Sequence, residues 1–411
     1  MSTRAVVKGD HLVDISARTL NLGTENAFVV LQEVNELLAK GKDVVNFCIG
    51  QPDFDTPEYI KQAAIEALEK GMTGYTASAG IPELREAVAT YLSESRNIQV
   101  KPESVVVANG AKPFIGYTIL STTDHGKGDE VLYPNPGFPI YESLIKEYGA
   151  VPVPLPLLER KGYAFDIDYM ESKVNEKTKL LILNSPHNPT GGVLSRKTLM
   201  EISEVVEKYD NLWVYSDEPY SRMAQEGEFT SIASIPGMQE RTIIVDGVSK
   251  TYAMTGWRIG YASNIKLAPH LSRWITNTDS CAAHPNQYAA AAALRGPQEE
   301  SHMMMRSYTI RRDIIVDGLN SIPGISCLMP GGAFYAWPNV SEACKLVDVA
   351  DSEEFRMRLL DEAGVAVLSD IHFGHRNPDE GDHIRFSYAT SEENIRKGLE
   401  RIRRFIEENT V

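Results

Sequence analysis

The stretch Gly247-Val248-Ser249-Lys250-Thr251-Tyr252-Ala253-Met254-Thr255-Gly256-Trp257-Arg258-Ile259-Gly260 carries the strongest signal in the chain. It places Lys250 after the apolar run Thr242-Ile243-Ile244-Val245, which is typical of a buried strand. A lysine held in an apolar pocket has a depressed pKa, because desolvation disfavours the ammonium form. Such an amine can attack a carbonyl to form a Schiff base, and Arg258 can hold a phosphate. The stretch therefore predicts a cofactor that carries both an aldehyde and a phosphate.

The size and composition of the chain indicate an ordinary globular protein with two domains. It has 411 residues, of which 43% are hydrophobic and 24% are charged. The formal net charge of -15, with no basic run, argues against binding to nucleic acid or to an anionic membrane. No apolar run is long enough to span a bilayer, and no signal peptide is indicated.

The four cysteines are scattered and have no metal-ligand spacing, so no metal site is expected from them. They are typical of reduced thiols, which predicts a cytoplasmic protein. The cysteines are Cys48, Cys281, Cys327 and Cys344.

Between residues 56 and 290, short apolar runs alternate with helical segments such as Ser195 to Tyr209. Unbroken apolar runs suit strands buried on both faces of a mostly parallel sheet, and the alternation predicts an α/β domain with three layers. The expected strands are centred on Val105–Val107, Glu130–Tyr133, Leu180–Leu183, Leu212–Tyr215 and Ile243–Val245.

Residues 291–411 have a different pattern, which predicts a smaller α+β domain. Residues 1–55 are expected to form an arm and to join this smaller domain. The expected elements are a helix from Ala27 to Lys40, a strand from Val44 to Ile49, helices at Pro297–Leu319, Glu353–Ala363 and Ser391–Glu408, and extended runs at Ala333–Trp337, Val365–Leu368 and His383–Ser387.

Three more polar segments follow expected strands, where ligands bind in open α/β sheets. The small residues Gly110 and Ala111, before Lys112 and Pro113, suit an anion at a helix N-terminus, although on their own an ordinary strand-to-helix turn explains them better. Asn188 lies in an Asn-Pro-Thr-Gly phrase that turn chemistry also explains. Asp217 precedes Glu218-Pro219-Tyr220 and is either a helix cap or a buried carboxylate.

Taken with the Lys250 stretch, these segments resemble class I/II aminotransferases, the fold-type I enzymes that use pyridoxal 5'-phosphate (PLP). The resemblance extends from about Gly41 to the last helix, and Ala253-Met254-Thr255-Gly256-Trp257-Arg258 is similar to the prokaryotic aspartate-type branch. It implies a PLP-dependent aminotransferase that moves an amino group between an L-amino acid and a 2-oxo acid by a ping-pong mechanism.

The resemblance also implies roles for individual residues. Lys250 holds PLP and then serves as the general base, while Asp217 keeps the pyridine nitrogen protonated. Arg385 holds the α-carboxylate of the substrate through its planar fork. The remaining expected cofactor contacts are Gly110, Ala111, Lys112, Phe138, Asn188, Tyr220, Ser249 and Arg258, and Gly50 and Asn188 also border the substrate.

Tyr75 matches a tyrosine that the family sends from one subunit to the phosphate of the other, which implies a homodimer with shared active sites. The resemblance further implies that one or both of the Asn135–Pro136 and Asn188–Pro189 bonds are cis.

The amino acid that is used is left open. Lys112 occupies a position where aspartate-type relatives bind a distal carboxylate, but it can equally reach the cofactor phosphate or solvent. Cys281 and His284, within Asn277–Gln287, depart from the family pattern, as does Leu368–Gly374, and both segments are expected near the substrate.

Two alternatives to a transaminase also remain at this point. One is another PLP reaction on an amino acid, such as an elimination, cyclisation, decarboxylation or condensation. The other is an aminotransferase-like regulator that binds DNA, against which the acidic balance and the short segment before Gly50 argue.

Overall fold

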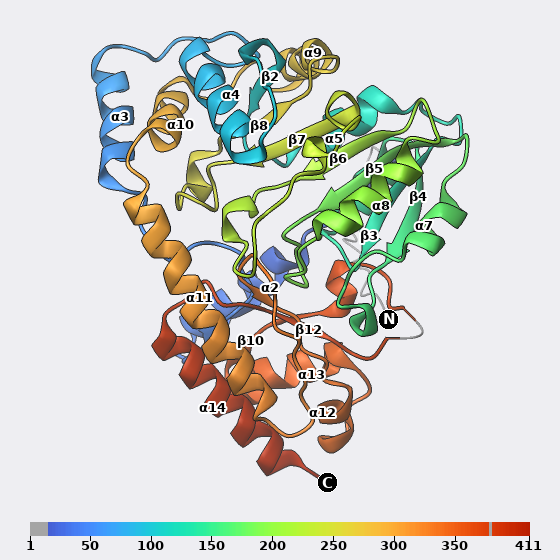
Figure 1. Ribbon diagram of the computed structural model, residues 1–411. Helices are drawn as coiled ribbons and strands as arrows, with labels where there is room; N and C mark the ends of the chain where they lie inside the picture. Colours follow the sequence, from blue (N-terminus) through green and yellow to red (C-terminus); the bar gives the residue numbers. More distant parts are fainter. Residues whose placement is uncertain (1–14, 378–379) are drawn as a thin grey trace.

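The computed structural model describes residues 15–377 and 380–411, and a seven-stranded sheet lies at its centre (Figure 1). The strand order is β2-β8-β7-β6-β5-β3-β4, and all paired neighbours are parallel except those of β8, which runs antiparallel to β2 and β7. The strands are β2 (Val105–Ala108), β3 (Glu130–Asn135), β4 (Val151–Pro156), β5 (Thr178–Asn184), β6 (Trp213–Asp217), β7 (Thr242–Gly247) and β8 (Gly260–Ser263).

Helices cover both faces of this sheet, because successive side chains of each strand point to opposite sides. In β5, Leu180 and Ile182 pack on one face with α5 (Pro113–Thr122), α6 (Ile140–Glu147) and α9 (Ala268–Thr278). The intervening Leu181 and Leu183 pack on the other face with α7 (Ile167–Lys173) and α8 (Arg196–Val206). Farther along this second face lie α4 (Pro82–Arg96) and α10 (His284–Arg295), and α3 (Glu58–Glu69) packs on them. The three-layer α/β architecture with a mostly parallel sheet is therefore confirmed.

The C-terminal half forms a separate core with two small sheets. β12 (Ile384–Ser387) lies between β11 (Leu368–Ser369) and β9 (Tyr335–Ala336), antiparallel to both. Around them lie α11 (Glu299–Asn320), α12 (Ser341–Leu346), α13 (Ser352–Arg358) and α14 (Glu392–Asn409), and Figure 1 shows α14 alongside the long α11.

The segment before residue 55 joins this second core. β1 (Val45–Asn46) pairs in parallel with β10 (Val365–Ala366), and Val45 and Phe47 are buried among side chains of the C-terminal half. The helices α1 (Ala17–Asn21) and α2 (Asn26–Ala39) precede β1. The boundaries at residues 55 and 290 stay a prediction.

Several expected elements differ in extent. The strand expected at Val44–Ile49 is reduced to β1, and the run Val365–Leu368 is divided at Val367 because β10 and β11 belong to different sheets. The helix expected to continue from Glu353 to Ala363 finishes as a π-helix over Leu359–Ala363. These short elements are fixed by distant partners, and local sequence carries little information about such pairing.

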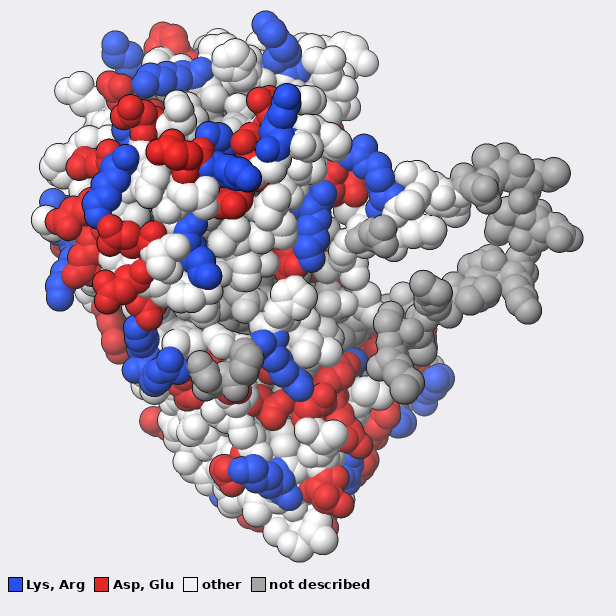
Figure 2. All heavy atoms as spheres, turned by 90° about the vertical axis from the view of Figure 1, so that its right-hand side faces the viewer, with Lys and Arg blue, Asp and Glu red and all other residues white. Residues whose placement is uncertain are grey.

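The surface is of mixed charge on the side seen in Figure 2, where Lys and Arg side chains are interspersed with Asp and Glu. In the described ranges, no helix has both the length and the apolar character that crossing a bilayer requires.

Candidate active site

A cavity of about 540 Å³ opens where several strands of the large sheet end. Asn184, Asp217 and Gly247 are the last residues of β5, β6 and β7, and all three line it. Parallel strands present their carboxyl ends at one edge, so the polar segments that follow them meet there. The residues expected from the sequence that line the cavity are Gly50, Ala111, Lys112, Phe138, Asn188, Asp217, Tyr220, Ser249, Lys250, Arg258 and Arg385.

Lys250 follows β7 by three residues and is only partly exposed. Its Nζ donates a hydrogen bond to the carbonyl oxygen of Gly50 and lies 5.8 Å from the centre of the Phe334 ring. Burial lowers the pKa of Lys250 to about 8, because the ammonium loses hydration, while the carboxylate of Glu25 acts in the opposite direction. About a tenth of the amine is therefore neutral at pH 7, far more than for a lysine with the ordinary pKa of 10.5.

Asp217 is buried at the end of β6, with 9% of its surface exposed. The Tyr141 hydroxyl, from α6, donates to its Oδ2. Burial raises the pKa of Asp217 to about 7, because the carboxylate loses water, and the Tyr141 hydrogen bond offsets only part of this effect. A cation beside the carboxylate would restore its ordinary charge.

Gly110 and Arg258 pack tightly at one end of the cavity. A Cβ on Gly110 would lie 2.1 Å from Arg258 Nη2, so the guanidinium occupies the place of a side chain. Arg258 donates to the carbonyl oxygens of Thr255, at 2.9 Å, and Asn109, at 3.3 Å. Gly110 contacts Arg258 but does not itself line the cavity, whereas Ala111, Lys112 and Ser249 do. This end combines a guanidinium, an ammonium and a hydroxyl with the N-terminus of α5, a set of groups that suits a phosphate.

Arg385 reaches the cavity from β12, and it is 3% exposed. Its Nη1 donates to Asn188 Oδ1 at 2.9 Å, and its Nη2 donates to the carbonyl oxygen of Cys48. The guanidinium lies between the rings of Tyr335, at 4.5 Å, and Phe373, at 4.8 Å. These contacts fix an arginine fork that suits a carboxylate.

Tyr220 and Tyr335 connect the two halves of the molecule at the cavity wall. Their hydroxyl oxygens are 2.7 Å apart, and both residues are buried. A Cβ on Gly50 would lie 2.0 Å from Tyr335 Oη, which explains the need for glycine there.

Lys112 is paired with Glu25, which comes just before α2. Lys112 Nζ lies 2.6 Å from Glu25 Oε2 and 5.3 Å from the centre of the half-buried Phe138 ring. Lys112 is therefore a cation of the cavity wall, besides Lys250, Arg258 and Arg385, that already has a carboxylate partner.

Tyr75 lies outside the cavity wall and is 91% exposed in the single chain. Cys281 and His284 do not line the cavity of the single chain, and the expectation that their segment lies near the substrate stays a prediction. Cys281 Sγ accepts a hydrogen bond from the Thr76 amide at 3.5 Å, and His284 Nδ1 lies 3.2 Å from the Gly74 carbonyl oxygen. Both residues hold the loop that carries Tyr75.

Both expected cis bonds, Asn135–Pro136 and Asn188–Pro189, are present, and Ser185–Pro186 is also cis. Four residues of the cavity wall were not expected from the sequence: Glu25, Tyr141, Asn184 and Tyr335. Asn184 had a usable signal, because it is the last residue of an expected strand next to other polar residues. Tyr141 and Tyr335 had none, because tyrosines in a helix and in a short strand are common core residues.

Comparisons with known proteins agree with this geometry. The family model for aminotransferase class I and II matches residues 42–402. The chain is 38% identical to a probable aspartate/prephenate aminotransferase of Aquifex aeolicus, over 96% of this chain and 99% of that protein. It is 36% identical to an aspartate aminotransferase of Geobacillus stearothermophilus, with the same coverage.

A solved structure has the same fold throughout. The aspartate aminotransferase of Rhizobium meliloti superposes with a TM-score of 0.90 at 31% identity, over 97% of this chain and 100% of that one. The chain belongs to the aminotransferase class I and II family, has the fold-type I architecture of its structural neighbours, and is a transaminase.

Proposed function

We propose that this transaminase uses PLP, bound in the cavity at the ends of β5, β6 and β7, with Lys250 as the residue that holds it. One observation carries the proposal. Asp217 ends β6 and Lys250 follows the neighbouring strand β7, both line the same cavity, and burial shifts their pKa values to about 7 and about 8. A pyridinium ring and a carbonyl carbon are the groups that such a carboxylate and such an amine suit.

The residues present fit this cofactor. Arg258, Ser249 and the backbone of Ala111 surround one end and would hold the phosphate. Asp217 would pair with the pyridine nitrogen, and Tyr220 and Asn188 would bond the phenolic oxygen. Gly110 supports the fit, because any side chain there would displace the Arg258 guanidinium.

When bound, PLP supplies a carbonyl that accepts amino groups and a ring that withdraws electrons from the substrate. Lys250 Nζ then takes the proton from the substrate Cα, for which its lowered pKa suits it. Asp217 stabilises positive charge on the ring nitrogen, and Tyr141 orients the carboxylate. Arg385, held by Asn188 and the Cys48 carbonyl oxygen, orients the α-carboxylate of the amino acid.

The proposed substrate class rests on Lys112. Lys112 can bind the distal carboxylate of an acidic amino acid when that carboxylate displaces Glu25. Relatives named aspartate aminotransferase support an acidic substrate such as L-aspartate, with a 2-oxo acid as the acceptor. These names do not favour the alternative PLP reactions.

We also propose that the enzyme is a cytoplasmic homodimer with shared active sites. Tyr75 supports the dimer, because a tyrosine that is 91% exposed and lies on a loop braced by Cys281 and His284 is suited to contact a second subunit. The four free cysteines support a reducing compartment.

A single-turnover experiment tests the proposed reaction. PLP-loaded enzyme is mixed with L-aspartate without any 2-oxo acid, and the 2-oxo product is counted. A transaminase with ping-pong kinetics yields at most one equivalent of product per site and resumes only when an acceptor is added. Product that accumulates beyond one equivalent without an acceptor would instead indicate an elimination or a decarboxylation.

A further inference from the structure

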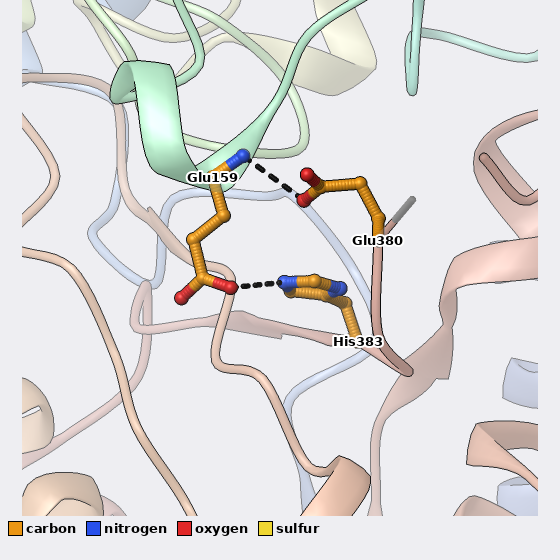
Figure 3. A group of neighbouring side chains, drawn as sticks. All are labelled: Glu159, Glu380 and His383. Atoms are coloured by element: carbon orange, nitrogen blue, oxygen red, sulfur yellow. Dashed lines mark hydrogen bonds and ion pairs between the residues drawn. The ribbon is translucent and has the colours of Figure 1, made fainter. Parts of the chain in front are cut away.

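Two glutamates and a histidine that do not line the cavity meet where the two halves of the chain touch (Figure 3). Glu159 begins the short 3-10 helix Glu159–Lys161, after β4 of the large sheet. Glu380 and His383 precede β12. One ligand atom from each of the three lies within 4.8 Å of the others, and this is the one such group within residues 15–377 and 380–411.

The histidine presents a bare nitrogen to this group. His383 is 3% exposed, and its Nδ1 lies 2.8 Å from the carbonyl oxygen of Gly381, so Nδ1 carries the hydrogen. Its Nε2 is buried, makes no hydrogen bond with any described residue, and lies 3.3 Å from Glu159 Oε2. A nitrogen lone pair facing a carboxylate oxygen is repulsive, so a positive species is needed between them.

Each of the three side chains is also held by a neutral hydrogen bond to a backbone group or to a neighbouring amide side chain. Asn339 Nδ2 donates to Glu159 Oε2, and the Glu159 amide donates to Glu380 Oε2, both at 2.9 Å. The Gly381 carbonyl oxygen holds His383. Metal ligands are oriented in this way, with the second ring nitrogen of the histidine donating to a carbonyl and the carboxylates hydrogen-bonded in turn.

The charge near the group is not balanced by the protein. Within residues 15–377 and 380–411, the Lys or Arg that forms an ion pair with the group is Arg160, whose Nη1 is 3.7 Å from Glu380 Oε1 and whose side chain is 57% exposed. An exposed pair of this length contributes little. Two carboxylates therefore face the His383 ring at a partly buried site.

We propose that Glu159, Glu380 and His383 bind a divalent cation of the zinc type, which joins the large sheet to the start of β12. A tetrahedral ion with ligand bonds of about 2.0–2.1 Å has ligand atoms about 3.3 Å apart, and Nε2 and Oε2 are already 3.3 Å apart. One imidazole with two carboxylates suits zinc better than magnesium or calcium, which prefer oxygen alone. The fourth position takes a water.

The ion would act on the active site through β12. His383 comes two residues before Arg385, and its carbonyl oxygen accepts a hydrogen bond from the Asp370 amide at 2.9 Å. Fixing the His383 ring fixes the start of the strand that carries the Arg385 guanidinium. The site is thus a positioning site, remote from the reacting atoms.

Trp337 provides a reporter for the test. Its ring stacks on the imidazole of His383, with centroids 5.6 Å apart and planes at 10°. PLP-loaded enzyme is freed of metal with a chelator and titrated with Zn²⁺, while tryptophan fluorescence and calorimetric stoichiometry are followed. The expected result is one ion per chain, with a fluorescence change that is absent in Trp337→Phe.

Two variants and a matched control make the test specific. Glu380→Gln and Glu159→Gln each remove a ligand charge and keep the side-chain volume, and each is expected to weaken binding at least 10-fold. His375→Gln is the control, because His375 forms a similar pair with Glu142, at 3.1 Å, but is 72% exposed and outside the group. Thermal unfolding in chelator establishes that each variant is folded.

Two outcomes would overturn the site. One is Zn²⁺ binding that is unchanged in both glutamate variants. The other is fluorescence that follows pH but does not respond to Zn²⁺, which would mean that a proton on His383 is the positive species. Because the readout is metal binding, failure here leaves the proposed transaminase reaction untouched.

Discussion

At the scale of single residues, Lys250 and Asp217 are ionisable groups whose charged forms are disfavoured by burial in the cavity. Burial lowers the pKa of Lys250 to about 8 and raises that of Asp217 to about 7. Each shift means that the charged form has lost water without gaining a full partner. A pyridine nitrogen would pair with the Asp217 carboxylate, and a carbonyl carbon would react with the Lys250 amine. Groups whose pKa values are shifted in this way are common at functional sites.

Asp217 gives the cofactor-free protein a specific dependence on pH. Its pKa is about 7 in the folded state against 3.8 ordinarily, so the folded state binds its proton more tightly. This contribution to stability is present below pH 3.8 and is lost as the pH rises through about 7, by at most about 4 kcal/mol. Asp217→Asn should remove this decline. Urea unfolding of the cofactor-free parent and of Asp217→Asn at pH 5 and pH 8 measures the decline in the free energy of unfolding. Equal declines in the two proteins would contradict a raised pKa for Asp217.

Glu25 is expected to control the use of acidic substrates. Glu25→Gln frees Lys112 from its partner, so the KM for L-aspartate should fall about 2- to 5-fold, the size expected of a partly exposed ion pair. The KM for L-alanine, which has no distal carboxylate, should stay the same. Glu36→Gln, an exposed charge on the same α2, is the control variant. An equal change for both amino acids would mean that Glu25 has no role in selectivity.

At the scale of elements, the strands with a local apolar run could be predicted from the sequence. The strands that are defined by pairing with a distant strand could not. The strands β2, β3, β5, β6 and β7 contain short apolar runs, so their existence could be predicted. The edge strand β4 was missed because Pro152, Pro154 and Pro156 argue against a strand, yet an edge position tolerates them. The short β8 was missed because Gly260–Ser263 has little apolar character, and pairing with β2 and β7 defines it.

The candidate site divides in the same way. Asp217, Lys250 and Asn188 could be predicted, because polar residues that follow parallel strands converge at one edge of the sheet. Tyr141 and Tyr335 could not, because their roles depend on how α6 and β9 pack against the cavity. Glu25 was missed for the same reason, because the sequence does not indicate that the loop before α2 folds against the cavity.

The last helix, α14, is expected to need glycine at position 398. A Cβ there would lie 2.4 Å from Phe47 Cε2, so Gly398→Ala should cost about 1–3 kcal/mol of stability. Alanine is otherwise the better helix former by about 1 kcal/mol, so the packing clash and the helix propensity predict opposite signs. Glu400→Ala, exposed on the same helix, reports propensity alone. A Gly398→Ala protein as stable as the parent in urea would refute this packing.

At the scale of the whole molecule, the site requires both halves of the chain and, by our proposal, a second subunit. Arg385 comes from the C-terminal half and Lys250 from the large sheet. Tyr75, on the surface of one chain, would complete the site of its partner. Mixing Tyr75→Ala with Lys250→Ala should therefore restore activity, because one site of each hybrid dimer has both native residues. A mixture no more active than the average of its two parents would rule out sharing.

The most direct test of the central claim is the activity and cofactor binding of Lys250→Ala beside Lys197→Ala, whose lysine is 86% exposed on α8. Removal of Lys250 should abolish measurable turnover of L-aspartate, while Arg258, Ser249 and Asp217 keep PLP bound at the end of the sheet. Borohydride reduction should fix PLP to Lys250 in the parent and in Lys197→Ala, and to no residue in Lys250→Ala. Normal turnover by Lys250→Ala, or PLP fixed to another lysine, would contradict the account.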